Sequence, residues 1–131
     1  MDATDLHQAL AHAAAGACVC FEGWVRDHHQ GRQVRGLTYQ AYTELAEREG
    51  EAIMAEACAQ FDLRAARAVH RVGDLAVGEL AVWVGVSSDH RDAAFTACRW
   101  IIDALKARVP IWKHEHYVDG SALWQHPDGP R

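Results

Sequence analysis

The proline between two lysines constrains the fold of this chain more than any other sequence feature. The run Leu105-Lys106-Ala107-Arg108-Val109-Pro110-Ile111-Trp112-Lys113-His114-Glu115 changes character at Pro110. Proline has no backbone N–H and disfavours the helical conformation in the residue before it, so any helix that precedes Pro110 must end there. The run therefore predicts a helix that leads into an extended strand, with Lys106 before the corner and Lys113 after it.

Both lysines stand among Leu, Val, Ile and Trp residues in the sequence, so their ammonium groups are candidates for losing a proton more readily than usual. An ammonium group is costly to keep charged in apolar surroundings. A lysine tuned in this way can act as a nucleophile or a proton carrier, whereas an arginine stays charged. Lys106 and Lys113 are therefore the first candidates for catalysis.

Hydrophobic periodicity predicts the element order α-β-β-α-β-β-α-β. The predicted strands cover residues 17–25, 34–42, 64–72, 79–87 and 111–118. Three helices are predicted, and the first covers residues 3–15. The second is capped by Thr43, and its buried side carries Leu45, Ile53, Ala57 and Phe61. The third is capped by Ser88 or Asp89, and its apolar stripe consists of Ala94, Cys98, Ile101 and Leu105. The stretches 26–33 and 73–78 are predicted to be an exposed loop and a connection. Because short hairpin links outnumber crossovers, we expect an α+β fold with a mostly antiparallel sheet packed against helices.

Length and charge exclude several classes of protein. The 131 residues are expected to form one domain over 1–131, with a frayed tail at 126–131. A net charge of −5 argues against a nucleic-acid partner, so any anion site must be a local basic pocket. No apolar run approaches the roughly 20 residues that span a bilayer, and the acidic start lacks the basic region of a signal peptide. These features predict a cytoplasmic protein with no membrane partner.

Two pairs of metal-binding residue types allow alternative interpretations. Cys18 and Cys20 share one face of a predicted strand, either as small buried hydrophobic residues or as part of a metal or persulfide site. His114 and His116 also share one face of a strand, either as surface imidazoles or as ligands of a metal hydrolase. The interpretation without a metal is favoured for both pairs: Cys18 and Cys20 as small buried residues, and His114 and His116 as surface imidazoles. All four cysteines are expected to be free thiols.

Three further basic residues lie at predicted element ends. Arg26 stands where an apolar strand breaks into a loop, and a guanidinium there could bind a phosphate. His90 and Arg91 stand where a strand leads into the long helix, and the N-terminus of a helix favours anions. Together with Lys106 and Lys113 they predict a dedicated anionic pocket, on the assumption that the fold brings them together.

The chain resembles the large, catalytic subunit of molybdopterin synthase from about Gly16 to Trp124. The resemblance is carried by an ordered set of stretches: Phe21-Glu22-Gly23-Trp24-Val25-Arg26, Leu37-Thr38-Tyr39-Gln40-Ala41-Tyr42, His70-Arg71-Val72-Gly73-Asp74-Leu75, Gly78-Glu79, Ser87-Ser88-Asp89-His90-Arg91, Ala94-Phe95, Asp103-Ala104-Leu105-Lys106 and Val109-Pro110-Ile111-Trp112-Lys113-His114-Glu115.

The resemblance implies an α/β-hammerhead fold and a homodimer at the centre of a heterotetramer. Each end would bind a small ubiquitin-like sulfur carrier whose Gly-Gly C-terminus is a thiocarboxylate. The substrate would be cyclic pyranopterin monophosphate, which receives two sulfurs to form the dithiolene of molybdopterin. No metal or other cofactor would be needed in this subunit.

The resemblance also suggests residue roles. Arg26, His90 and Arg91 would bind the substrate phosphate, Lys113 would contact the thiocarboxylate, and Lys106 would be the general acid or base, although the two lysines could exchange roles. Phe21, Pro110, Ile111 and Trp112 would form the pocket wall.

Two departures from the family pattern bear on the site. His114 stands where the family has a second basic residue, and the C-terminal end offers only His126 and Arg131 to a neighbouring subunit's site. Outside the resemblance, the chain could be a non-catalytic module that docks a ubiquitin-like protein, with the lysines serving only in salt bridges.

Overall fold

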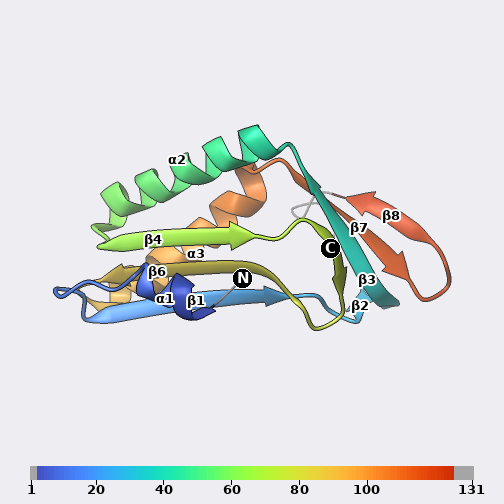
Figure 1. The fold of residues 1–131 in the computed structure, drawn as a ribbon, viewed down its shortest axis with the longest axis horizontal. Coiled ribbons are helices and arrows are strands. Elements are labelled where there is room, and N and C mark those ends of the chain that lie inside the picture. The colour runs from blue at the N-terminus through green and yellow to red at the C-terminus, as the bar shows by residue number, and fades with distance from the viewer. Residues whose placement is uncertain (1–2, 126–131) are drawn as a thin grey trace.

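The computed structural model describes residues 3–125, within which three helices and eight strands are assigned (Figure 1). The helices are α1 (Ala3–Gln8), α2 (Thr43–Phe61) and α3 (Arg91–Arg108). The strands are β1 (Ala17–Trp24), β2 (His28–His29), β3 (Arg32–Ala41), β4 (Ala65–His70), β5 (Gly73–Ala76), β6 (Leu80–Ser88), β7 (Ile111–Tyr117) and β8 (Ala122–Gln125). The tail at 126–131 lies outside the described residues.

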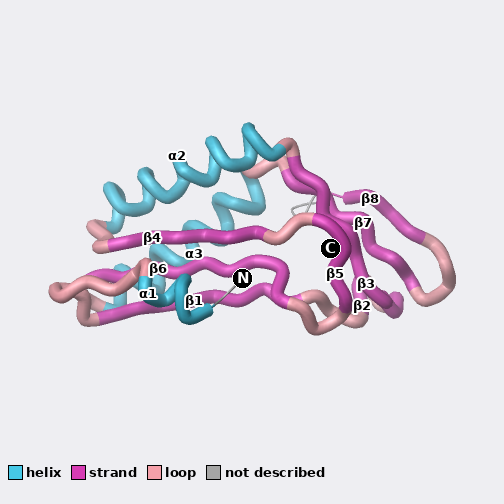
Figure 2. Tube along the Cα trace, in the orientation of Figure 1, coloured by secondary structure: helices cyan, strands magenta, loops and turns pink. Residues whose placement is uncertain are grey.

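The strands form two sheets instead of the single sheet that the sequence predicts. One has the order β1-β6-β4, and the other has the order β2-β3-β7-β8 with β5 paired to β3. Every strand pair in the described part of the chain is antiparallel. The second sheet stands at one end of the first (Figure 2). The predicted α+β class with antiparallel sheets and packed helices is confirmed.

The main core lies between the three-stranded sheet and the helices α2 and α3. Helix α3 packs against β1 and β6, and α2 packs against both α3 and β4. Ile53 and Ala57, one turn apart on α2, are fully buried, as are Val84 of β6 and Ile101 of α3. The predicted apolar stripe of α3 is therefore confirmed. Leu45, which was expected on the buried side of α2, is instead 48% exposed because it lies in the first turn, beyond the edge of the core.

The N-terminal helix is shorter than the predicted 3–15. It ends at Gln8 because Leu10 is drawn into the core: its side chain is 1% exposed, and its carbonyl accepts a 2.6 Å hydrogen bond from Ser87 Oγ. The imidazole of His12 then accepts the backbone N–H of Ala14, which diverts it from a helical bond. A short alanine-rich helix has little stability of its own to resist these contacts.

The expected caps of the two long helices are also wrong. The N-cap positions are Tyr42 for α2 and His90 for α3, and neither makes a side-chain cap hydrogen bond. Ser88 remains in β6 and donates to the His90 carbonyl, while Asp89 binds Arg64.

Three short strands were missed because their signals are local and weak. The segment 26–33, predicted as a loop, contains β2, and the connection 73–78 contains β5. Leu75 is the one buried residue of β5 and pairs across the sheet with Leu37 of β3. β8 pairs with β7. Among the described residues, no helix is long and apolar enough to cross a membrane.

Candidate functional site

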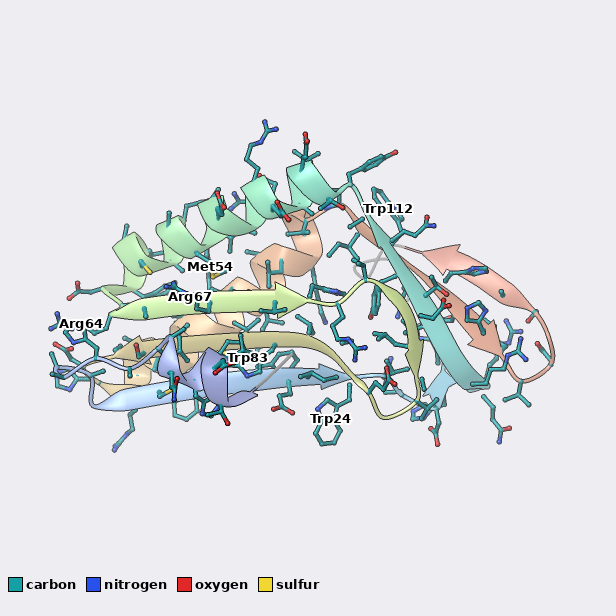
Figure 3. The ribbon with its side chains drawn as sticks, viewed as in Figure 1. Trp24, Met54, Arg64, Arg67, Trp83 and Trp112 are labelled. Carbon is teal, nitrogen blue, oxygen red and sulfur yellow. The ribbon has the colours of Figure 1, made fainter. Side chains whose placement is uncertain are left out.

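A cavity of about 1040 Å³ lies among both sheets and the two long helices. Its apolar wall includes Phe21 of β1, Val82 and Val84 of β6, and Leu105 of α3. Met54, which also lines it, projects from α2 toward β4 (Figure 3). The charged residues that line the cavity are Arg26, Arg67, Lys106, Lys113, Glu47, Glu51 and Glu115. A mostly apolar cavity of this size with a few polar groups is typical of a ligand site.

The two predicted lysines both line this cavity, but their surroundings differ. Lys113, on β7, has a side chain only 15% exposed, and its Nζ lies 2.8 Å from Glu115 Oε1. Lys106 lies in the last turn of α3, where the helix dipole favours a cation. None of the ion pairs found among residues 3–125 involves Lys106.

Two residues of the site were not predicted from the sequence, Glu115 and His29. The Glu115 side chain is 4% exposed and that of His29 is 6% exposed, with 3.6 Å between His29 Nδ1 and Glu115 Oε1. Glu115 could have been found, because strand alternation places it on the same face as Lys113. His29 carries no such signal, since it lies in a polar stretch with no apolar neighbour.

Burial controls the titration of the groups around Glu115. It lowers the pKa of His29, and the nearby Glu115 carboxylate opposes that shift only in part. Burial also raises the pKa of the Tyr39 and Tyr117 hydroxyls, and the negative charge of Glu115 adds to both shifts. His70, which lines the same cavity, has a pKa lowered by burial. The polar end of the cavity therefore favours neutral imidazoles.

Half of the predicted pocket wall is present: Phe21 and Ile111 line the cavity, whereas Pro110 and Trp112 do not. Arg26 lines it as well. Alternation along β7 turns Ile111, Lys113 and Glu115 toward the cavity and Trp112 to the opposite face. There Trp112 packs edge-to-face on Tyr42 with ring centroids 5.4 Å apart. The Pro110 carbonyl accepts the backbone N–H of Tyr42, which fixes the corner before β7.

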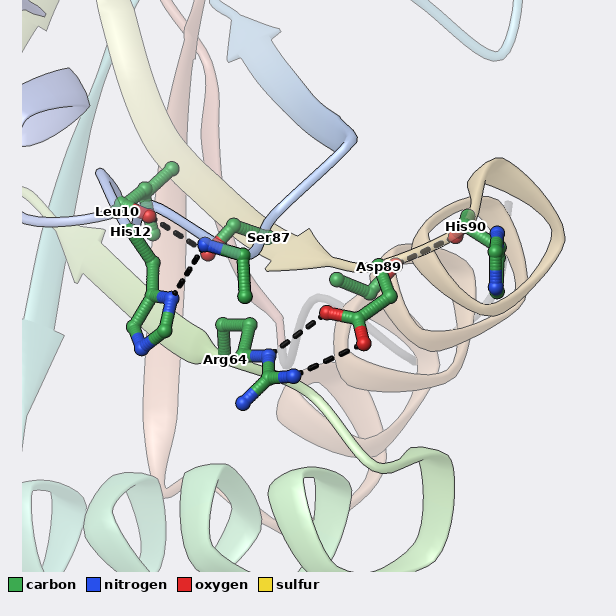
Figure 4. A network of polar contacts seen from close by, with 8 residues as sticks. Leu10, His12, Arg64, Ser87, Asp89 and His90 are labelled. Carbon is green, nitrogen blue, oxygen red and sulfur yellow. Dashed lines mark hydrogen bonds and ion pairs between the residues drawn. The ribbon is translucent and has the colours of Figure 1, made fainter.

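The structure does not bring His90 and Arg91 to this cavity within one chain. They begin α3, whereas Lys106 stands in its last turn, and the rise of 1.5 Å per residue separates the two places by about 24 Å. His90 lies instead beside the ion pair in which Arg64 Nε and Nη2 approach the Asp89 carboxylate at 2.7 and 2.9 Å (Figure 4). Both His90 and Arg91 are exposed.

The histidine pair on β7 faces away from the lysine site. His116 Nε2 lies 2.9 Å from Thr38 Oγ1, and the His114 and His116 rings are 4.9 Å apart. Within residues 3–125, no group of three or more histidine, cysteine or acidic side chains has the arrangement of a metal site.

The cysteine pair on β1 is less buried than predicted for small hydrophobic residues of a core. Cys18 is exposed and Cys20 half-buried, with their sulfurs 4.0 Å apart. Cys20 Sγ also lies 3.6 Å from His7 Nε2. Burial, followed by the neighbouring Cys18, raises the pKa of Cys20 to about 12, so this thiol stays protonated at neutral pH.

Comparison with known proteins places these features in one family. Residues 1–108 match the model of the family described as MoaE protein. A rice (Oryza sativa subsp. indica) molybdopterin synthase catalytic subunit is 47% identical over 112 residues, which are 86% of this chain. The matched region spans 58% of the length of the rice protein.

Solved structures share the fold. Molybdopterin synthase from Staphylococcus aureus superposes with a TM-score of 0.90 at 33% identity, covering 95% of this chain and 90% of that one. A chain from the Helicobacter pylori complex of subunits 1 and 2 of molybdopterin-converting factor superposes with a TM-score of 0.70 at 22% identity, covering 85% and 72%.

Proposed function

We propose that this chain, which belongs to the MoaE protein family, is the catalytic subunit of a molybdopterin synthase. The observation that carries the proposal is the cavity, where Lys106 of α3, Lys113 of β7 and Arg26 of the loop after β1 converge onto one apolar space. The 47% identity to a protein of that name supports it.

The proposed reaction converts cyclic pyranopterin monophosphate to molybdopterin by transfer of two sulfurs. The donor would be the thiocarboxylate at the Gly-Gly C-terminus of a small ubiquitin-like subunit. An anionic tail and a phosphorylated substrate both require positive charge, and a partly dry cavity increases the electrostatic contribution of each cation. The mostly apolar wall suits the flat pterin ring.

The surroundings of the two lysines support distinct roles for them. Lys113 projects into the cavity from β7 and lies 2.8 Å from Glu115 Oε1, a position from which its ammonium can contact an anionic sulfur donor. No ion pair within residues 3–125 involves Lys106, so it suits the general acid or base that acts as the ring opens.

The far position of His90 and Arg91 supports a role for a second copy of the chain. If they bind the same substrate as Lys106, they must come from the other protomer of the proposed homodimer. Arg64 already neutralises Asp89 beside them, so that carboxylate would not repel a phosphate strongly. The predicted contribution of His126 and Arg131 to a neighbouring site falls outside the described residues.

The test is to mix the protein with a thiocarboxylated small subunit and the cyclic precursor and to measure dithiolene product. Lys113→Ala and Lys106→Ala should each abolish most product formation while small-subunit binding, measured by gel filtration, persists. Arg99→Ala is the matched control, because Arg99 is an exposed cation on the same helix as Lys106 with only an exposed partner. Normal product formation in both lysine variants would contradict the catalytic assignment and favour a docking module.

A further inference from the structure

Two basic side chains converge on a single oxygen of a buried carboxylate in the cavity wall. Lys113 Nζ lies 2.8 Å and His29 Nδ1 lies 3.6 Å from Glu115 Oε1. The second oxygen, Oε2, and both ring nitrogens of His29 are buried without a hydrogen-bond partner among the described residues. Buried polar atoms without partners are costly, so Glu115 Oε2 and the His29 ring nitrogens favour any rearrangement that gives them hydrogen bonds.

The arrangement poses an electrostatic problem for the proposed function, on which this inference rests. Lys113 and Glu115 cancel each other's charge, so the lysine offers little net attraction to an anion. An anionic group placed beside Lys113 would also lie close to the Glu115 carboxylate, which would repel it. A buried charge left without a partner is strongly unfavourable, so Lys113 cannot simply leave Glu115 to meet the ligand.

We propose that His29 resolves this conflict by taking up a proton when an anionic ligand binds beside Lys113. The proton comes from solvent and attaches to the ring of His29, whose N–H then donates to Glu115 Oε1. The Lys113–Glu115 contact breaks, and the Lys113 ammonium turns to the ligand. The carboxylate keeps a cationic partner throughout, and the site gains one positive charge for the one negative charge that arrives.

The groups that face His29 make the sign of this effect clear. They are Glu115 and Lys113 on β7, Arg26 after β1 and His28 on β2 itself, while the Tyr39 and Tyr117 hydroxyls act on Glu115. Burial lowers the pKa of His29, with Lys113, Arg26 and His28 acting in the same direction, so the ring is neutral in the free protein at pH 7. A bound anion adds negative charge and raises that pKa. Anion affinity should therefore increase as the pH falls through the window between the two pKa values, by up to about tenfold per pH unit.

The test uses a synthetic peptide ending in Gly-Gly with a free carboxylate, and the same peptide as its C-terminal amide. Isothermal titration calorimetry at pH 6.5 in buffers of different ionisation enthalpy gives the number of protons taken up on binding. We expect uptake of a substantial fraction of one proton with the carboxylate peptide and none with the amide. His29→Gln should abolish the uptake. His12→Gln should preserve it, because His12 is exposed and does not line the cavity.

A direct measurement covers the case in which His29→Gln fails to fold. Nitrogen-15 NMR of the wild-type imidazoles should show the His29 ring changing from neutral to doubly protonated as the carboxylate peptide is added. The inference is overturned if the ring stays neutral, if His29→Gln keeps the uptake, or if the carboxylate peptide binds no better than the amide. Product formation by the complete synthase decides the proposed function separately, since His29 could stay neutral in an active enzyme.

Discussion

Removing the Lys113 ammonium should destabilise the protein far more than removing an exposed cation. The Lys113 and Glu115 side chains are 15% and 4% exposed, and Lys113→Met leaves the carboxylate buried without its closest partner. Breaking a buried ion pair from one side costs about 3–5 kcal/mol. Since Lys113 retains some solvent contact and His29 lies near the same oxygen, we expect a value near the lower end, about 3 kcal/mol.

The double variant Lys113→Met/Glu115→Gln separates the ion pair from other effects of the substitutions. Without the carboxylate there is no unpaired charge, so the double variant should lose at least about 2 kcal/mol less than the sum of the two single variants. Arg64→Ala is the control, because its ion pair with Asp89 has side chains 39% and 43% exposed and should contribute less than about 1 kcal/mol.

The assay is equilibrium unfolding in urea at pH 7.5 and a fixed protein concentration, followed by tryptophan fluorescence. If Lys113→Met costs no more than Arg64→Ala, or if the two single effects simply add in the double variant, the buried pair does not hold the site as argued. A second series at pH 6 bears on His29, because a protonated ring should take over the carboxylate and reduce the cost of Lys113→Met.

Three further predictions concern packing, pH and thiol chemistry. Gly85→Ala should cost about 1–3 kcal/mol in the same urea assay, because its Cβ would lie 2.4 Å from the Trp83 ring, whereas Gly50→Ala, with open space around it, should be neutral or stabilising. Burial lowers the pKa of His70 in the folded protein, so the unfolded chain binds a proton more readily. The free energy of unfolding should therefore fall as the pH drops below about 6.5 and level off below the folded-state pKa. His70→Gln should weaken this pH dependence in the same urea assay. Cys18 is the exposed thiol among the four, so it should account for the fastest phase of alkylation by iodoacetamide at pH 8, and Cys18→Ser should remove that phase.

The sequence predicts the long elements well because their signals are repeated within each element. The stripe of α3 recurs over several turns, and Pro110 ends the helix for a reason that no tertiary contact can override. The short strands β2 and β5 form by pairing with β3, and their own residues carry no pattern that predicts a strand. The same holds for the helix that stops at Gln8, whose length is decided by where Leu10 is buried.

The site was predictable to the extent that its residues share one element. Lys113 and Glu115 are two positions apart on β7, so strand alternation alone places them on one face and removes Trp112 and His114 from it. Their neighbour His29 comes from a strand that precedes β7 by about eighty residues, and only the pairing of β2 to β3 and of β3 to β7 brings it there. No local pattern encodes that approach.

The distance of His90 and Arg91 from the cavity could not be predicted either, because no local pattern shows which parts of the chain meet in the fold. Basic residues at element ends suggest a common pocket, but every helix has two ends, and α3 holds these residues about 24 Å from Lys106. A rigid helix with 18 residues cannot bend to close that distance, and its buried face is fixed against β1 and β6. A single ligand that contacts Lys106 and the start of α3 therefore requires two chains, each supplying one end of its own helix. A synthase assembled from one chain that carries Lys106→Ala and one that carries Arg91→Ala should then regain activity at one of its two sites. Two inactive parents that stay inactive when mixed would show that His90 and Arg91 serve another purpose.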